Sequence, residues 1–418
     1  MRKYAWIVGC VLILLATPLM GAGGEEYIWI NIINPNLAVG RQTNYAGDHI
    51  DVVDVKNHKV AFKVTGIPDP TDRVFSPDGS RVYITSVTTE HNVYVVDAKN
   101  GKTIAKIAMS GRPNRPSISK DGKWLYVAIR DPGPAVAIAD TKVEDLDYNF
   151  DNKYQWAKHG GAVDFVDTAS LKVVKSVPTS GPLHNCYVTP DQKFVACDSP
   201  EGRNVAVVDI KAEKLAWEAP IQGPHPEITI FRHGDPQSMS VEAGPDGSTN
   251  RLTVEIRGLR GFAVVDFKAH KQIGIVTLPD QPGGFLSNAD EPHTHGDRSY
   301  DGKTRWVASQ DSNAYFIYSI PDDKLLGYVS MPEIKASDNP DFLAAGHKNR
   351  AIGCNTGDFE FTKDGKQIWA ECSPGFGVAP YLFGVDVANR KLLDDHIALN
   401  EDAKQGDPRA LSVIQKKQ

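Results

Sequence analysis

The sequence repeats a short apolar segment that ends in aspartate, and this repeat constrains the fold more than any other feature. Six alternating runs end in this way, at Asp54, Asp97, Asp167, Asp209, Asp266 and Asp386. A seventh, degenerate copy covers residues 315–319. Each copy precedes a polar turn and a second apolar run, such as residues 59–64. Two runs joined by a tight turn are typical of a β-hairpin.

A second type of hairpin lies upstream of most copies. Its turn contains an aspartate, usually followed by glycine, at Asp78, Asp121, Asp191, Asp246, Asp301 and Asp364. The segment after the turn is again apolar, as in residues 81–86. Each unit therefore predicts four antiparallel strands, and such units arranged around a ring form a β-propeller.

The chain ends complete the repeat. Residues 27–31 match the second strand of a unit that lacks a first strand, and residues 407–414 match a first strand with nothing after it. Pairing these segments completes a seventh blade and removes the free edges of the ring. We therefore predict an all-β fold: one seven-bladed β-propeller domain over residues 25–418, built from four-stranded blades and closed by both chain ends.

Composition fits many short strands and excludes several classes of protein. The 418 residues include 36 Gly and 27 Pro, which favour turns, and the hydrophobic fraction of 41% is that of an ordinary globular protein. The formal net charge is −6. Because the chain has no basic block, we expect no nucleic-acid partner.

The first 24 residues have the pattern of a secretory signal peptide. Arg2 and Lys3 precede an apolar run over residues 4–19, and small residues follow around Ala22. This pattern predicts export to the periplasm or an equivalent oxidising compartment, with no stable membrane span after cleavage. A retained membrane anchor is the alternative.

Four cysteines follow the signal segment, and the chain contains no Cys-x-x-Cys-His motif. We therefore expect no covalently attached haem. Cys186 and Cys197 flank a turn, so in a hairpin they lie opposite each other at a distance that allows a disulfide. Cys354 and Cys372 flank another turn less symmetrically. Unpaired buried thiols are the alternative for both pairs.

Several segments exceed the needs of seven blades. They cover residues 130–161, 223–235, 241–251, 280–291 and 331–356. Long ordered insertions on a rigid scaffold usually contact partners or line a pocket. The alternative is that they are passive solvated loops.

Polar residues precede or begin the predicted first strands, which border the central funnel of a propeller. We predict cofactor-binding roles for His184, His295, Arg115 and Arg409, because imidazole ligates metals and Arg binds carboxylates. His293 and His295 form a His-x-His pair that could bind a divalent metal together with His347 or His184. Hydrogen-bonded funnel histidines, or axial ligation of a haem from another chain, are the alternatives.

No motif for a catalytic nucleophile, a phosphate loop or a dinucleotide is present, so we predict no catalytic residue. The recurring carboxylates, such as Asp54, Asp97 and Asp209, are expected to cap the turns that follow them. Trp124, Trp306 and Trp369 recur near the start of second strands and are expected to pack between blades.

These repeats resemble the YVTN family of seven-bladed propellers and, more loosely, the haem d propellers of dissimilatory nitrite reductases, over residues 26–415. In kind, the chain is also similar to the propeller subunits of hydrazine synthases, which form hydrazine from nitric oxide and ammonium. That resemblance implies a subunit of a redox complex, in the anammoxosome lumen, whose haem belongs only to cytochrome c-type partner chains.

The same resemblance implies that the hairpin over residues 241–251 reaches toward a neighbouring subunit, with Glu242, Asp246 and Glu255 as candidate metal ligands. The alternative is a stand-alone enzyme that binds or makes a haem d-type tetrapyrrole, with His184 or His295 as the iron ligand. Whether the chain is itself an enzyme stays open.

Overall fold

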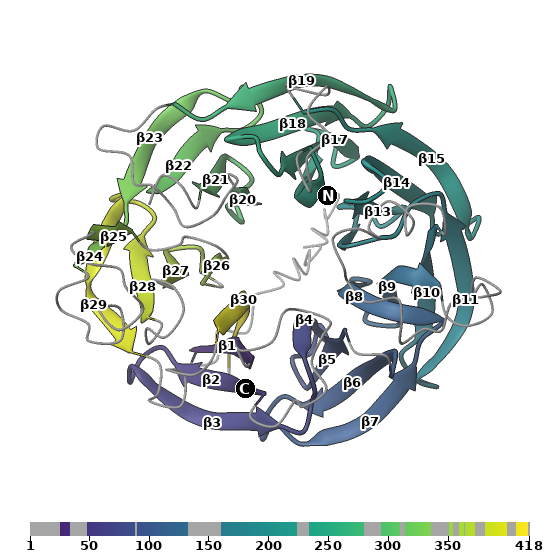
Figure 1. Ribbon diagram of the computed structural model, residues 1–418, viewed down its shortest axis with the longest axis horizontal. Coiled ribbons are helices and arrows are strands. Elements are labelled where there is room, and N and C mark those ends of the chain that lie inside the picture. Colours follow the sequence, from purple (N-terminus) through teal and green to yellow (C-terminus); the bar gives the residue numbers. More distant parts are fainter. Residues whose placement is uncertain are drawn as a thin grey trace, which may run out of the picture.

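Seven four-stranded antiparallel sheets surround a central axis (Figure 1), which confirms the predicted seven-bladed β-propeller. The computed structural model describes residues 26–33, 48–87, 90–132, 160–223, 234–279, 294–309, 314–335, 351–353, 359–362, 364–372, 381–398 and 407–416. The predicted signal peptide lies outside these residues. The described part contains no helix that is long and apolar enough to cross a membrane.

Blades are numbered in chain order, and within each blade the strands are given from the axis outward. Blade 1 contains β30 (Asp407–Lys416), β1 (Glu26–Ile33), β2 (His49–Asp54) and β3 (Lys59–Thr65). Blade 2 contains β4 (Pro70–Phe75), β5 (Arg81–Ser86), β6 (Asn92–Asp97) and β7 (Thr103–Ala108). Blade 3 contains β8 (Gly111–Ile118), β9 (Trp124–Pro132), β10 (Gly161–Asp167) and β11 (Lys172–Thr179). Blade 4 contains β12 (Cys186–Val188), β13 (Phe194–Ser199), β14 (Asn204–Asp209) and β15 (Lys214–Pro220).

The remaining blades follow the same order. Blade 5 contains β16 (Pro236–Ala243), β17 (Thr249–Ile256), β18 (Gly261–Asp266) and β19 (Lys271–Thr277). Blade 6 contains β20 (Thr294–Arg298), β21 (Thr304–Ser309), β22 (Ala314–Ser319) and β23 (Leu325–Ser330). Blade 7 contains β26 (Phe359–Phe361), β27 (Gln367–Cys372), β28 (Tyr381–Asp386) and β29 (Lys391–Ala398). A separate hairpin, β24 (Glu333–Lys335) with β25 (Ala351–Gly353), precedes blade 7.

Both chain ends meet in blade 1, as predicted. Strand β30 pairs antiparallel with β1, from Glu26 opposite Lys416 to Ile33 opposite Asp407. The side chains of β1 alternate between two hydrophobic clusters. Ile28 packs with residues of blade 7, and Trp29 packs with residues of blade 2. This alternation follows from the two-residue period of a strand, and it closes the ring with apolar contacts on both sides.

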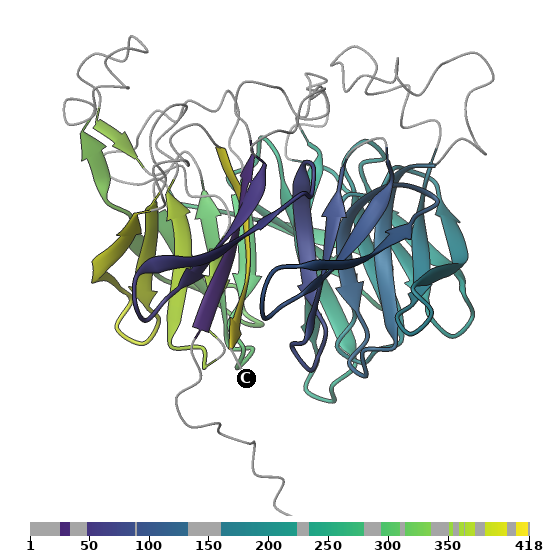
Figure 2. The same cartoon turned by 90° about the horizontal axis from the view of Figure 1, so that it is seen from below.

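The two faces of the ring differ. First and third strands begin at the face that we call the loop face, and the hairpin turns within the blades lie at the opposite face, the turn face (Figure 2). Every internal gap longer than one residue in the described ranges joins strand ends at the loop face. Four of the five predicted insertions therefore connect strands at this face. The fifth, residues 241–251, belongs to the β16–β17 hairpin of blade 5, which agrees with its prediction as an extended hairpin.

Aspartates organise both kinds of turn at the turn face. In the turn between first and second strands, a Ser or Thr hydroxyl donates to the Asp carboxylate, as Ser119 does to Asp121 over 2.7 Å. Asp carboxylates at the ends of third strands accept backbone N–H groups, as Asp209 does from Ala212 at 2.8 Å. The predicted turn-capping role is confirmed at Asp54, Asp97 and Asp209.

The outermost strand of every blade is irregular. In each blade the register between the third and fourth strands shifts once, for example between Val95 and Val96 of β6. The extra residue in blade 2 is Ile104, whose side chain is exposed. Such a bulge bends the strand and interrupts its ladder of hydrogen bonds.

Gly101 tests the packing between blades 1 and 2. It has φ of +73°, and a Cβ atom there would lie 2.8 Å from Cγ2 of Val64. We expect Gly101→Ala to lower the free energy of unfolding by about 1–2 kcal/mol through backbone strain, and by a further 1–3 kcal/mol, roughly, through overpacking. The midpoint of urea unfolding measures this loss.

Gly247→Ala is the matched control, because Gly247 has φ of +78° and nothing within 4 Å of an added Cβ atom. This variant should lose only the part of the free energy of unfolding that comes from backbone strain. Equal losses in the two variants would contradict the proposed contact with Val64.

Candidate functional site

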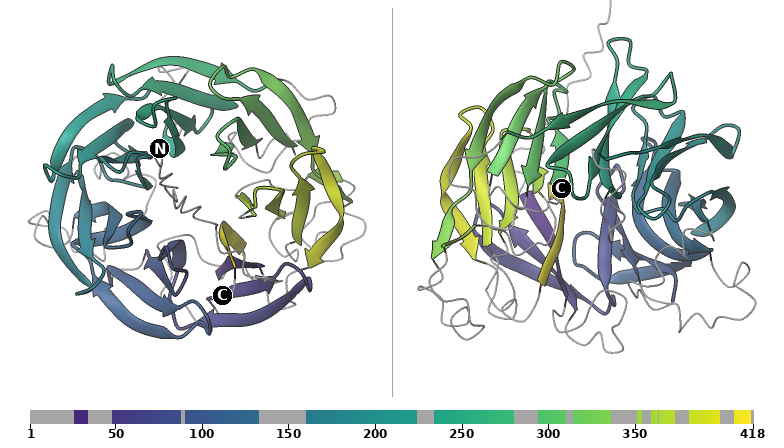
Figure 3. Two further views of the ribbon diagram at one scale, coloured as in Figure 1. Left: turned by 180° about the vertical axis from the view of Figure 1, so that it is seen from behind. Right: turned by 45° about the horizontal axis from the view of Figure 1, so that its top comes forward.

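The inner wall near the loop face gathers a set of polar residues from neighbouring blades. Strands β8, β12, β16 and β20 contribute to this wall, and the innermost strands surround the axis in both face-on views (Figures 1 and 3). We call six of these residues the central cluster: Arg115, His184, Tyr187, Asp198, Glu255 and Asp297.

His184 is the best-positioned member of the cluster. It directly precedes Asn185 and β12, and its backbone N–H donates to Asp198 O at 2.9 Å. Its Nδ1 lies 3.0 Å from the carbonyl oxygen of Gln237 in blade 5 and 3.4 Å from Oδ2 of the buried Asp198.

The protonation of the His184 ring follows from these neighbours. Nδ1 faces two acceptor oxygens, and Asn185 Nδ2, which also lies 2.9 Å from Nδ1, has its own acceptor in Gln237 O at 2.7 Å. We therefore assign the proton to Nδ1. Nε2 has no hydrogen-bond partner among the described residues, and the side chain is 25% exposed. The ring can thus offer a lone pair to a metal ion or accept a proton.

Arg115 and Tyr187 lie beside His184. The backbone N–H of Arg115 donates to His184 O at 3.2 Å, so strand β8 of blade 3 is tied to blade 4. The guanidinium carbon of Arg115 lies 5.0 Å from the ring centroid of Tyr187, within cation–π distance. Burial raises the pKa of Tyr187, and the positive charge of Arg115 partly offsets this rise.

Glu255 is a buried acid with one unsatisfied oxygen. Its Oε2 accepts a hydrogen bond from Ser238 Oγ at 2.8 Å, whereas Oε1 has no hydrogen-bond partner in the described residues. Gly296 packs against Oε1, where a Cβ atom would overlap with it. Burial raises the pKa of Glu255 well above its usual value, and the negative charges of Asp198 and Asp297 raise it further.

Asp297 behaves similarly. Burial raises the pKa of its carboxyl group, although the Arg298 backbone N–H at 2.7 Å and the charge of Arg115 oppose the rise. The central cluster therefore contains two carboxyl groups that hold protons more firmly than ordinary acids. Acids with raised pKa values are suited to proton transfer.

The three carboxylates predicted as metal ligands are not brought together. Glu255 lies opposite Ser238, whereas Glu242 lies opposite Arg251, about 13 Å further along β16. Asp246 lies in the exposed turn, where Oδ1 accepts Ser248 Oγ at 2.6 Å. Within the described residues, no group of three potential metal ligands occurs.

Glu242 belongs to a buried ion network instead. It contacts the guanidinium groups of Arg251 and Arg305, and Arg251 also donates to both carboxylate oxygens of Asp323 at 2.8 Å. Burial lowers the pKa of Arg305 to about 9. Because Asp323 lies in blade 6 and Arg251 in blade 5, the network links neighbouring blades. Its charges are compensated, which suits a structural role.

Other predicted residues are placed only in part. His295 lies in β20 opposite Ala308, and Arg409 lies in β30 opposite Asn31, but their side chains are outside the described part of the structure. His293 and His347 also lie outside it, as does Cys354. The metal prediction for the histidines stays a prediction.

Sequence reasoning missed Asp198, Gln237, Tyr187 and Asp297. One signal was present. Asp198 and Glu255 occupy equivalent positions in their second strands, because each lies four residues after the residue that pairs with the last Asp of the third strand. Polar residues at that position are unexpected in a buried second strand. Gln237 acts through its backbone carbonyl, which no sequence pattern marks.

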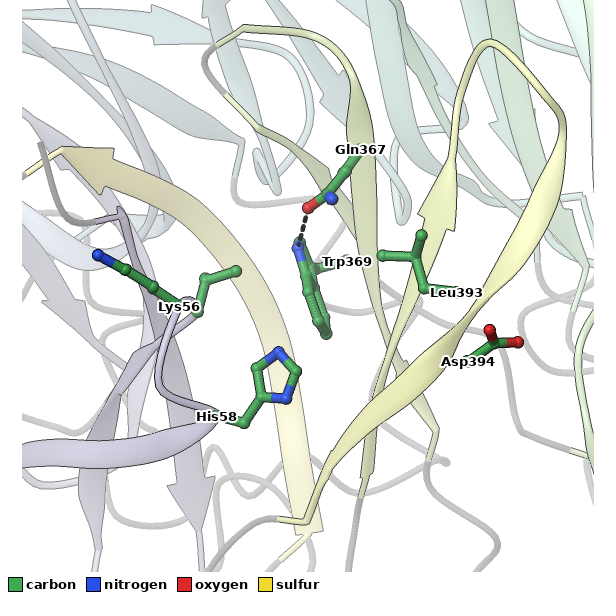
Figure 4. A pocket seen from close by; sticks show the side chains of 7 residues that line it. Lys56, His58, Gln367, Trp369, Leu393 and Asp394 are labelled. Atoms are coloured by element: carbon green, nitrogen blue, oxygen red, sulfur yellow. Dashed lines mark hydrogen bonds between the residues drawn. The ribbon is translucent and has the colours of Figure 1, made fainter. Parts of the chain in front are cut away.

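A cavity of about 470 Å³ lies between blades 1 and 7 (Figure 4). It is lined by the turn after β2 and by strands β27 and β29, with Val55, Lys56, His58, Gln367, Trp369, Leu393 and Asp394. The rings of His58 and Trp369 meet edge-on at 6.0 Å, and Trp369 Nε1 donates to Gln367 Oε1 at 3.2 Å. The cavity shares no residue with the central cluster. We take the central cluster as the candidate site.

The raised pKa of Glu255 predicts a pH dependence of stability. The folded state favours the protonated acid. The stabilisation of the fold by protonated Glu255 is therefore fully present below the pKa of the unfolded chain, about 4.3, and is lost as pH rises toward the pKa of the folded state. In Glu255→Gln this loss is absent. As pH rises through that window, the free energy of unfolding of the variant should therefore increase relative to that of the wild type by up to about 1.4 kcal/mol per pH unit.

Urea unfolding between pH 4 and 8, roughly, measures this difference. Glu213→Gln, at an exposed turn position, is the control and should follow the wild-type profile. Parallel profiles for Glu255→Gln and wild type would show that Glu255 ionises normally.

No protein-family model and no curated protein sequence matches the chain significantly. Solved structures do match it. A functionally unknown protein from Desulfotomaculum acetoxidans DSM 771 aligns with a TM-score of 0.57 at 12% identity, over 92% of this chain and 99% of that one.

Two other structures are similar. Kuenenia stuttgartiensis hydrazine synthase aligns with a TM-score of 0.50 at 16% identity, over 77% of this chain and 78% of that one. The dihydro-haem d1 dehydrogenase NirN, in complex with DHE, aligns with a TM-score of 0.49 at 14% identity, over 90% of this chain and 73% of that one. At these identities the likeness concerns the fold, and the chain is a seven-bladed β-propeller.

Proposed function

We propose that this chain is an exported propeller subunit of a redox complex, with no covalent cofactor of its own, that scaffolds or gates cytochrome c-type partner chains. The observation that carries the proposal is the position of the central cluster. It lies near the loop face, where the four long connections leave the ring. A partner held by these connections would sit directly over the cluster.

The chemistry of the cluster supports a gating role. Redox reactions of small molecules commonly move protons together with electrons. Glu255 and Asp297 have raised pKa values, and Nε2 of His184 has no hydrogen-bond partner among the described residues, so the wall offers groups that can donate or accept a proton. Within this class, hydrazine synthase is our named candidate, because one of its structures shares the fold.

Export is supported by the disulfide between Cys186 and Cys197, which confirms the predicted pairing of these two residues. Structural disulfides form and persist mainly in oxidising compartments. This agrees with the signal-peptide pattern of the first 24 residues and with a location in the periplasm or an equivalent lumen.

Purification from the native host tests the proposal. We expect the chain to co-purify with stoichiometric cytochrome subunits, and the separated chain to have no visible absorbance of its own. Mass spectrometry of the complex and a visible spectrum of each subunit are the measurements. A monomer that carries a Soret band would overturn the proposal.

The second candidate is a tetrapyrrole-binding enzyme, and the anchored His184 ring favours it. Histidines that ligate metals usually donate the other ring N–H to a carboxylate or carbonyl group, and Nδ1 of His184 has both at hand. His184 would hold the iron, and Arg115 could bind a propionate. A bound tetrapyrrole would supply redox or ligand-binding chemistry at its iron.

His184→Ala tests the second candidate. If His184 ligates haem, the variant should lose most of the Soret absorbance after haem reconstitution and weaken haem affinity at least tenfold. His270→Ala is the control, because His270 stacks on Trp217 at 4.7 Å in blades 4 and 5, outside the central cluster. Equal haem binding by His184→Ala and the wild type would eliminate His184 as the ligand.

A further inference from the structure

The disulfide lies directly beside the candidate site. Cys186 of β12 and Cys197 of β13 are opposite each other, with a Cα–Cα distance of 4.2 Å, and both are fully buried. His184 precedes Cys186 by two residues, and Asp198 follows Cys197 directly. One covalent bond therefore joins the two strand segments that bring His184 and Asp198 together.

Strand β12 is the shortest strand of blade 4. It has three residues, and Cys186 is the last one paired with β13 before the chain continues toward His184. Beyond it, three hydrogen bonds join the two segments: His184 N to Asp198 O at 2.9 Å, Asp198 N to Asn185 O at 3.0 Å, and Asn185 N to Asp198 Oδ1 at 3.1 Å. Arg115 N of blade 3 also donates to His184 O at 3.2 Å.

Blades 2 and 5 use longer first strands at the same register, whereas the first strand of blade 7, β26, also has three residues. In blade 2, Arg73 of the six-residue β4 lies opposite Ile84, and in blade 5, Met239 of the eight-residue β16 lies opposite Val254. These pairs are not covalent. Blade 4 thus combines a short inner strand with a covalent cross-link at the position nearest the site.

We propose that Cys186 and Cys197 are positioning residues of the His184 site. Their disulfide holds the His184 imidazole against Asp198 and Gln237, so that the ring keeps one tautomer, with the proton on Nδ1 and the lone pair on Nε2. The inference rests on the proposed role of His184. Without the bond, the end of β12 can separate from β13, and Nδ1 loses its fixed position between Gln237 O and Asp198 Oδ2. The ring then rotates and exchanges tautomers as a free histidine does.

The bond also sets when the site is completed. Closure removes two protons and two electrons from the two thiols, and an external disulfide takes them up and becomes two thiols. Because both cysteines are buried in the folded ring, this exchange occurs during folding. The site is therefore completed only in an oxidising compartment, and it resists reductants afterwards.

Imidazole nitrogen NMR of protein labelled with 15N-histidine tests the positioning. In the wild type, we expect His184 to show a single tautomer with the proton on Nδ1. In the double variant Cys186→Val and Cys197→Val, which keeps an apolar pair of similar size, the His184 signals should shift to averaged values of exchanging tautomers. His184→Gln assigns the signals.

Ile84→Ala is the matched control, since it weakens the equivalent strand pair in blade 2 without touching blade 4. It should lower the thermal midpoint and leave the His184 tautomer unchanged. A folded double variant that keeps the wild-type tautomer would overturn the proposal. If the double variant fails to fold, wild-type protein reduced in urea and returned to buffer with dithiothreitol serves as the comparison, and oxidised glutathione should restore the signal.

Native wild-type protein in dithiothreitol should keep the single tautomer, because the reductant cannot reach the buried bond. Loss of the tautomer in protein that is still folded would contradict closure during folding. The NMR measurement needs no haem, metal or partner. Its outcome is therefore independent of whether the chain joins a redox complex or binds a tetrapyrrole.

Discussion

The pairing of β30 with β1 is the contact on which the rest of the ring depends. It joins residues from the two ends of the chain, and no contact within the other six blades can replace it. Because β1 also packs Ile28 toward blade 7 and Trp29 toward blade 2, it fixes the spacing of both neighbours. The inner wall keeps its shape only when this spacing is fixed, and the central cluster draws its members from four blades of that wall.

The two faces of the ring use polar residues differently. At the turn face, carboxylates such as Asp78 are occupied by hydroxyl and backbone donors, and the Ser76 hydroxyl is the first cause that lowers the pKa of Asp78. Near the loop face, Glu255 has one oxygen without a donor among the described residues, and burial raises its pKa. The same residue chemistry therefore serves local folding on one side and leaves reactive groups on the other.

Local sequence pattern predicted the strands, the closing blade and the Cys186–Cys197 pair, because alternation and turn residues act over a few positions. It could not predict which side chains meet across blades. His184 meets Gln237 of the next blade, and Glu242 meets Arg305, because ring curvature brings distant segments together. In the hairpin over residues 241–251, Glu242 contacts Arg251 of its own blade and Arg305 of blade 6, and the latter contact has no local sequence signal.

The bulge in each outermost strand has a consequence for assembly. A regular, flat edge strand would accept a strand from another molecule and let rings join side by side into sheets. Here the extra residue, such as Val174 in blade 3, twists the edge and places an exposed side chain where an incoming backbone would have to pair. The circumference of the ring is thereby protected from strand addition, which directs any specific association to its flat faces.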